Sequence, residues 1–220
     1  MARIAEDLLL LLLDNGAAQP AIEPSLLQRL LAAAVLLDLA YDCRVRPAVP
    51  GEPVPPDHLV ALAGPPPPLD PVVRPALTLL QEAPVTPSAA IAKLRKHTED
   101  RVIDQLLRTG QLHQISLSQN RFRRNSYAWP LASRTRVDAA RSAMLSTLFD
   151  GNCPNPVTAT IVSLLHTVGG LGAVLSLNDR GSQWVGDRAI EIASGTWVDD
   201  NKLAEVNLAV TTAAVRPALG

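Results

Sequence analysis

SLLQRLLAAAVLLDLAYDCRVR, residues 25 to 46, is the stretch that decides the fold. Leucine, valine and alanine occupy almost every face that this segment would present as a helix, and such a helix is either buried in a core or spans a membrane. Only eight uncharged residues separate Arg29 from Asp38, far fewer than the roughly 20 that a bilayer requires. We therefore predict a buried central helix, with Ser25 as its N-cap and with a hydrogen-bond or ion-pair partner for Asp38.

The composition is typical of a globular protein. The chain has 220 residues, of which 47% are hydrophobic, and its formal net charge is −1. This length suffices for one compact domain with a sizeable core, residues 1–220. A balanced charge argues against global attraction to nucleic acid or acidic lipid, although a local basic patch can still provide it. Cys43 and Cys153 are the only cysteines, and two thiols without a secretory signal indicate a reduced, cytoplasmic protein.

The segments on either side of the central helix also have patterns that predict their structure. Residues 4–13 predict a first buried helix, and the acidic Glu6 and Asp7 before its leucine run distinguish it from a signal peptide. Thirteen of the nineteen prolines lie between residues 47 and 87. Because proline removes backbone donors, we expect an irregular excursion there, with two weak strands at 44–49 and 58–63 and a short helix at 70–82.

The second half of the chain is mostly helical in its pattern. A helix is predicted over 88–109, with Ser88 as its cap and Gly110 as its end. Further helices are predicted over 133–149, over 157–177 with a break at the glycines, over 187–193 and over 199–215. The sequence therefore predicts a mainly α fold, a single compact helical domain around buried central helices with one or two short β-hairpins.

Residues 111–130 form the segment most suggestive of function. Ile115 and Leu117 alternate with polar neighbours, residues 118–120 offer a turn, and a return strand is expected from Arg121. Aromatic residues make up only 3% of the chain, yet three of them lie here beside three arginines. This mixture suits a membrane–water interface, a wing against a nucleic-acid backbone, or an ordinary edge hairpin whose arginines prevent aggregation.

The membrane interpretation is a hypothesis about two groups of residues. The hairpin residues expected to touch anionic lipid are Arg121, Phe122, Arg123, Arg124 and Trp129. The residues expected to assist them at the lipid headgroup, on the preceding helix, are Arg95, Lys96 and Arg101.

No catalytic or metal-binding pattern is present in the sequence. It has no phosphate-binding glycine loop, no paired-cysteine metal site and no nucleophile elbow, and its four histidines have no metal-ligand spacing. We therefore expect a non-enzymatic protein without cofactor or metal.

Five segments, in this order, resemble the Golgi phosphoprotein 3 family. They are AEDLLLLLLDNG (5–16), LLAAAVLLDLAYDCRV (30–45), RVIDQLLRTGQL (101–112), TATIVSLLHTVGGLGAVL (158–175) and RAIEIASGTW (188–197), the last of which is similar to bacterial members. The resemblance implies a mostly helical peripheral membrane protein. Family members bind phosphatidylinositol 4-phosphate at a basic pocket beside a hydrophobic hairpin, and in eukaryotes they link glycosyltransferase tails to vesicle coats.

The residues that match the family's lipid pocket differ from the family pattern. The position of its tryptophan falls at Glu23, that of its core-helix arginine at Ala32, and those of its later arginine pair at Lys96 and Glu99, with Arg95 one residue away. We therefore expect most of the specific headgroup ligands to be lost.

The expected partners are an anionic membrane lipid, with a phosphoinositide as the candidate, and an unidentified protein. The expected location is the cytoplasm, peripherally at the inner face of a membrane.

Two alternative functions stay open. One is a winged-helix-like DNA-binding module, against which Glu99, Asp100 and Asp104 argue because they would face phosphates. The other is a pure protein-interaction scaffold.

Overall fold

Asp38, the acidic residue inside the apolar central segment, joins the first two helices. In the computed structural model, which describes residues 3–64, 70–117, 127–175 and 179–220, its carboxylate accepts hydrogen bonds from the backbone N–H groups of Ile4 (2.8 Å) and Ala5 (3.1 Å). Both groups belong to the first turn of α1 (Arg3–Leu13), where N–H groups have no partner within the helix. The partner predicted for Asp38 is therefore the N-terminus of α1.

Helix α2 (Pro24–Tyr41) is the centre of the core, and residues 30–40 are all buried. It is long and apolar enough to cross a bilayer by length and composition, but 67% of that window is buried inside the protein. Its N-cap is Glu23, whose carboxylate accepts from the N–H of Leu26 at 3.0 Å. The prediction of Ser25 as the cap was wrong, because Pro24 already occupies the first helical position, where its missing N–H costs nothing.

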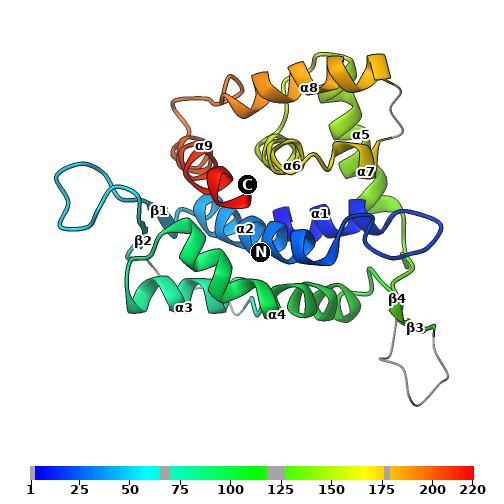
Figure 1. The fold of residues 1–220 in the computed structure, drawn as a ribbon, viewed down its shortest axis with the longest axis horizontal. Helices are drawn as coiled ribbons and strands as arrows, with labels where there is room; N and C mark the ends of the chain where they lie inside the picture. Colours follow the sequence, from blue (N-terminus) through cyan, green and yellow to red (C-terminus); the bar gives the residue numbers. More distant parts are fainter. Residues whose placement is uncertain (1–2, 65–69, 118–126, 176–178) are drawn as a thin grey trace.

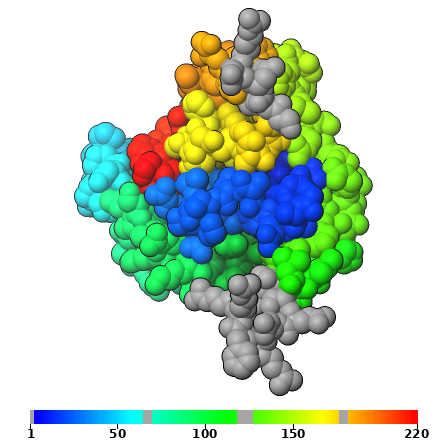
Figure 2. All heavy atoms as spheres, turned by 45° about the vertical axis from the view of Figure 1, so that its right-hand side comes forward, coloured from blue at the N-terminus to red at the C-terminus, as the bar shows by residue number. Residues whose placement is uncertain are grey.

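The helices are arranged in three layers around α1 and α2 (Figure 1). The lower layer holds α3 (Arg74–Glu82) and α4 (Pro87–Arg108). The upper layer holds α5 (Thr135–Phe149), α6 (Pro156–Thr167), α7 (Leu171–Val174), α8 (Asp179–Ala193) and α9 (Leu203–Val215), and a 3₁₀ turn follows at Arg216–Leu219. In the space-filling view the α1–α2 segment lies as a band between α6 and α4 (Figure 2). The predicted mainly α fold is confirmed.

Two small antiparallel sheets interrupt the helices. Strand β1 (Val45–Pro47) pairs with β2 (Leu59–Ala61), and β3 (Ile115–Ser116) pairs with β4 (Tyr127–Ala128). Both hairpins were predicted, but their strands are shorter than expected. The return strand of the second hairpin was expected from Arg121; its paired part begins at Tyr127, and residues 118–126 lie outside the described residues.

Several helix ends differ from their predicted positions. The cap of α4 is Thr86, whose hydroxyl accepts from the N–H of Ala89 at 3.3 Å, and not Ser88, which lies inside the helix. Helix α8 begins at Asp179 rather than at residue 187. Glycines 181 and 186 weaken the helical pattern there, but the buried Val185 and Ala189 stabilise the helix by packing. Helices α3, α5 and α9 begin later than predicted.

Arginines of α5 attach this helix to α1. Arg136 donates to Glu6 at 2.5 Å and to Asp7 at 2.6 Å. Burial raises the pKa of both carboxyls, and the interaction with Arg136 opposes that rise. One guanidinium thus serves two carboxylates, so that Arg136 offsets part of the cost of burying Glu6 and Asp7 at the α1–α5 contact.

Candidate functional site

The second hairpin follows α4 through a glycine turn. Gly110 has a φ of +67°, a backbone conformation that glycine adopts without strain. The N–H of Gln111 then bonds to the carbonyl of Leu106 at 2.8 Å, and Leu112 forms a bridge with Leu131. The end of α4 and the base of the hairpin therefore form one continuous structure.

The base of the hairpin is fixed to the loop after α1. The N–H of Trp129 donates to the carbonyl of Ala18 at 2.7 Å, and the side chain of Gln19 donates to the carbonyl of Tyr127 at 3.2 Å. The rings of Tyr127 and Trp129 lie 5.6 Å apart, and Trp129 is half-buried against the core. Of the five predicted hairpin residues, Trp129 thus lies at the anchored base, where it packs on the protein itself.

Strands β3 and β4 lie on the lower side of the molecule, next to the end of α4 (Figure 1). Ile115 and Leu117 are 50% and 54% exposed, although their alternation with polar residues is typical of a half-buried strand. Within the described residues both members of β3 are exposed. Neither apolar residue was among the predicted membrane contacts. In the sequence, both directly precede the segment that is rich in arginine and aromatic residues, and this position could have identified them.

The other four predicted hairpin residues, Arg121, Phe122, Arg123 and Arg124, lie outside the described residues. Their contact with lipid stays a prediction.

The predicted headgroup residues on α4 point in different directions. Arg95 and Lys96 are exposed and Arg101 is half-buried. At about 100° per residue, Lys96 and Arg101 are separated by roughly 140° around the helix axis, and Arg95 and Arg101 by roughly 120°. The helix therefore does not gather these three cations on one face. A joint role at one headgroup stays a prediction that this spacing does not favour.

Arg101 instead shares a hollow with Arg108. Both line an open depression of about 500 Å³ next to Asp104 and Leu107 of α4 and Pro71. Arg108 is positioned by its own helix, since it donates to the carbonyl of Asp104 at 3.3 Å and to the side chain of Gln105 at 3.0 Å. Two guanidinium groups and one carboxylate leave this hollow weakly basic, at the end of α4 that leads into the hairpin.

The residues that match the family's lipid pocket serve the fold. Glu23 caps α2, and Ala32 is completely buried. Glu99 is half-buried next to α2; burial and then the nearby Asp100 carboxylate raise its pKa, while a hydrogen bond with Gln28 lowers it. The buried Ala32 cannot reach a lipid headgroup. The carboxylates of Glu23 and Glu99 would repel a negatively charged headgroup.

Within the described ranges, the structure brings together no group of three or more His, Cys, Asp or Glu side chains that could hold a metal ion. Cys43 and Cys153 are free thiols.

Comparison with protein families identifies one family model, described as Golgi phosphoprotein 3 (GPP34), which matches residues 4–209. The match extends from α1 through α8, includes both hairpins, and ends within α9. No curated protein matches the chain.

Proposed function

The chain belongs to the Golgi phosphoprotein 3 family, and on this basis we propose that it is a non-enzymatic peripheral membrane protein that binds anionic lipid through the β3–β4 hairpin. The observation that carries the proposal is the pair of exposed apolar residues, Ile115 and Leu117, at the first strand of a hairpin whose base is anchored to the protein. Exposed apolar side chains in this position can enter the interfacial region of a bilayer without disturbing the core.

Electrostatic attraction supplies the second part of the proposed interaction. The segment between β3 and β4 contains Arg121, Arg123 and Arg124, and each basic residue close to an anionic surface contributes about 1 kcal/mol. The resulting affinity is weak and falls with ionic strength, because exposed charges are screened by salt.

We further propose that the total negative charge of the membrane, rather than one phosphoinositide headgroup, decides the binding. The absence of an aromatic residue at Glu23 and of a cation at Ala32 supports this view, as does the separation of Arg95, Lys96 and Arg101 around α4. The cytoplasmic face of a membrane, which carries the anionic lipids, is then the proposed location, and an adaptor role toward a protein partner follows the family.

Vesicle flotation tests the proposal. The protein is mixed with vesicles of phosphatidylcholine alone, with added phosphatidylserine, or with added phosphatidylinositol 4-phosphate at the same total charge. We expect equal binding to both anionic vesicles, none to the neutral vesicle, and loss of binding between about 50 and 300 mM salt. Replacing Ile115 and Leu117 by serine should weaken binding about tenfold, since two partly buried apolar side chains account for about 1.4 kcal/mol or more.

The matched control is Leu145→Ser, which removes an apolar side chain that is 38% exposed on α5 and should leave flotation unchanged. Absence of binding to every anionic vesicle would contradict the membrane function. A clear preference for phosphatidylinositol 4-phosphate at equal charge would contradict the charge-based specificity but not the membrane binding itself. A salt-dependent gel shift with duplex DNA, in a protein that does not float, would favour the DNA-binding alternative.

A further inference from the structure

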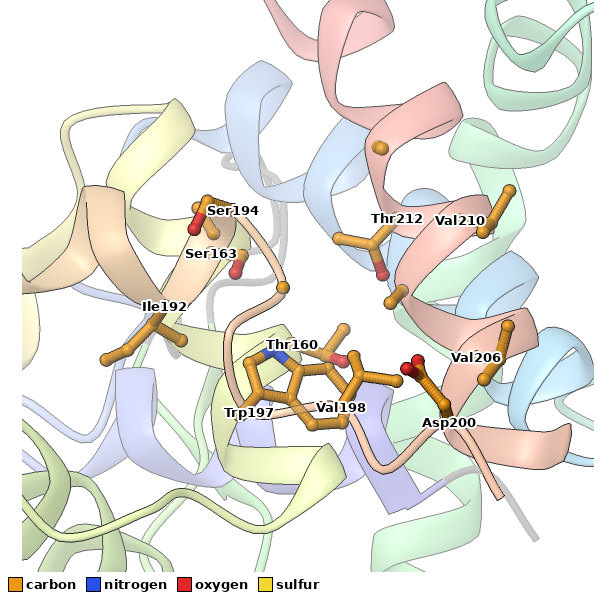
Figure 3. Close-up of a pocket in the computed structure, with 14 residues that line it drawn as sticks. Thr160, Ser163, Ile192, Ser194, Trp197, Val198, Asp200, Val206, Val210 and Thr212 are labelled. Carbon is orange, nitrogen blue, oxygen red and sulfur yellow. The ribbon is translucent and has the colours of Figure 1, made fainter. Parts of the chain in front are cut away.

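A cavity of about 290 Å³ lies in the upper layer, between α6, α9 and the segment that joins α8 to α9. Trp197 and Val198 of that segment lie across it from Val206 and Val210 of α9 (Figure 3). The volume corresponds to about ten water-sized groups at roughly 30 Å³ each. The cavity is therefore large enough for a compact organic molecule, near the lower end of the range of about 300–1,000 Å³ that is usual for ligand sites.

The elements around the cavity contribute small side chains to its wall. Thr160 and Ser163 of α6 and Thr212 of α9 are buried and line it, where larger apolar residues would fill the space at the usual packing density of a protein interior. Gly195, whose φ is +89°, turns the chain after α8, and Trp197 follows as another part of the wall. The shape of the cavity is thus set by ordered elements of the fold.

The hydroxyl groups of the lining offer acceptors rather than donors. Thr160 and Ser163 each donate to the backbone carbonyl four residues earlier at 2.8 Å, and Thr212 does the same at 2.7 Å. Ser194 donates to the carbonyl of Glu191 at 2.7 Å. A hydroxyl has one proton and two lone pairs, so each oxygen keeps acceptor capacity after its proton is used. A ligand that matches these oxygens must supply the donors.

The carboxylate of Asp200 adds a negative charge to the same lining. Asp200 is exposed at the solvent side of the cavity, and its side chain is directed toward the space between Val198 and α9 (Figure 3). Its neighbours Asp199 and Glu205 are both paired with Lys202. Within the ranges that the structure describes, no hydrogen bond or ion pair engages the carboxylate of Asp200. It can therefore accept charge-assisted hydrogen bonds from a cationic ligand.

The indole ring of Trp197 suits the same kind of ligand. It is half-buried against the core and lies toward the Asp200 end of the cavity in Figure 3. An aromatic ring packs against an apolar body and attracts a cation to its face. The cation at the far end of α9, Arg216, is engaged elsewhere, since it donates to Thr167 at 2.9 Å and to the carbonyl of Ala193 at 3.1 Å.

We propose that this cavity binds a small organic amine, whose apolar or aromatic body lies between Trp197 and Val210 and whose protonated amino group lies at Asp200. An alkylamine is ionised at neutral pH, as a lysine side chain is. Its N–H groups fit a lining of hydroxyl oxygens and one carboxylate, whereas an anion of the same shape would be repelled by that carboxylate. The cavity belongs to the upper layer, so this site is separate from the β3–β4 hairpin on the lower side (Figure 1).

Nuclear magnetic resonance of the nitrogen-15-labelled protein tests the proposal with three probes that share one body: phenethylamine, phenethyl alcohol and phenylacetate. Each tryptophan gives one indole N–H signal, and Trp197→Phe identifies the signal of Trp197. Trp129 and Trp184 lie outside the lining and serve as internal controls. We expect phenethylamine to shift the Trp197 signal with a Kd between about 0.1 and 10 mM. Phenethyl alcohol should bind about fivefold more weakly, and phenylacetate should leave the signal in place.

Variants of the lining locate the recognition of the amino group. Asp200→Asn should weaken phenethylamine binding about fivefold, as expected for one partly exposed ion pair, and should not change the binding of phenethyl alcohol. Asp187→Asn is the matched control, because it removes an exposed carboxylate of α8 that lies outside the lining; it should bind like the unmodified protein. Ala209→Leu places a larger side chain in the wall of the cavity and should abolish the binding of both probes.

Both aspartates are exposed, so their variants should keep the circular dichroism spectrum of the unmodified protein. A Trp197 signal that no probe shifts overturns the proposal. Equal affinity for the amine and the alcohol, or an amine affinity that Asp200→Asn leaves unchanged, also overturns it, because the carboxylate then does not recognise the ligand. Stronger binding of phenylacetate, or equal shifts of all three indole signals, overturns it as well. None of these measurements involves vesicles, so this proposal and the membrane function fail independently.

Discussion

At the scale of single residues, the acidic side chain that interrupts the most apolar helix joins two helices. Asp38 is buried in α2, and it accepts the N–H groups that begin α1. Burial raises the pKa of Asp38 well above its usual value near 3.8, and the hydrogen bonds from Ile4 and Ala5 oppose that rise. The carboxylate of Asp38 supplies the acceptor that the buried α1 N–H groups require.

We predict that Asp38→Ala lowers the free energy of unfolding by about 2–4 kcal/mol, because it leaves two buried N–H groups without acceptors. Asp38→Asn keeps one acceptor oxygen and should cost about half as much. Urea denaturation followed by circular dichroism measures both. An Asp38→Ala protein as stable as the unmodified one would show that the two N–H groups find other partners.

The raised pKa of Asp38 also predicts how the free energy of unfolding changes with pH. Above pH 3.8 the unfolded chain releases the proton of Asp38, whereas the folded protein retains it up to its raised pKa. The contribution of this carboxyl to stability is therefore full below pH 3.8 and falls as the pH rises through the folded-state value. The stability of the unmodified protein relative to Asp38→Asn should therefore decline as the pH rises above 3.8; a difference that grows with pH would contradict this assignment.

At the scale of elements, three helices begin in the same way. In α2, α4 and α6 a proline stands at the start of the helix, and the residue before it, Glu23, Thr86 or Asn155, accepts the N–H three positions later. Proline has a suitable φ and no N–H to satisfy, while the preceding side chain satisfies one of the remaining donors. These prolines therefore mark the helix starts, and the caps lie one residue before them rather than at the predicted Ser25 and Ser88.

Thr86→Ala should accordingly lower the free energy of unfolding by about 1 kcal/mol. Ser88→Ala, two residues further on and exposed inside the helix, should change it by less than about 0.5 kcal/mol, in the stabilising direction if at all, because alanine has the higher helix propensity. Thermal or urea unfolding of the two variants makes the comparison. The reverse order of effects would mean that Ser88 caps the helix in solution.

At the scale of the whole molecule, the two layers on either side of α1 and α2 share one core. Buried residues of α4 and of α6 belong to the same continuous cluster, which also contains the leucines of α1 and α2. Exposed apolar side chains lie away from this cluster, and among them are Ile115 and Leu117 on the hairpin and Leu203 and Val210 on α9. Stability and interaction are thus assigned to different parts of the molecule.

A shared core predicts one cooperative unfolding transition. Trp129 lies at the hairpin base of the lower layer, whereas Trp184 and Trp197 lie in the upper layer. Tryptophan fluorescence and far-ultraviolet circular dichroism should therefore give the same urea midpoint, and single-tryptophan variants that retain Trp129 or Trp197 should agree with each other. Two separate midpoints would mean that the layers fold as independent domains.

The helical class, the buried central helix, the need of Asp38 for a partner and the position of the second hairpin all followed from local patterning, because apolar periodicity and turn residues act over a few neighbours. The family resemblance was also contained in the order of such segments, and the family match confirms it. The limits of α8 did not follow, since packing of Val185 and Ala189 outweighs its glycines.

What only the tertiary structure decided is which side chains share a surface. It placed the carboxylate of Asp38 at the start of α1, and it left Ile115 and Leu117 uncovered. A sequence shows whether a residue is apolar, but whether water or another helix meets it depends on elements far away along the chain. For the same reason the β3–β4 hairpin, rather than the basic residues of α4, became the surface proposed for membrane binding.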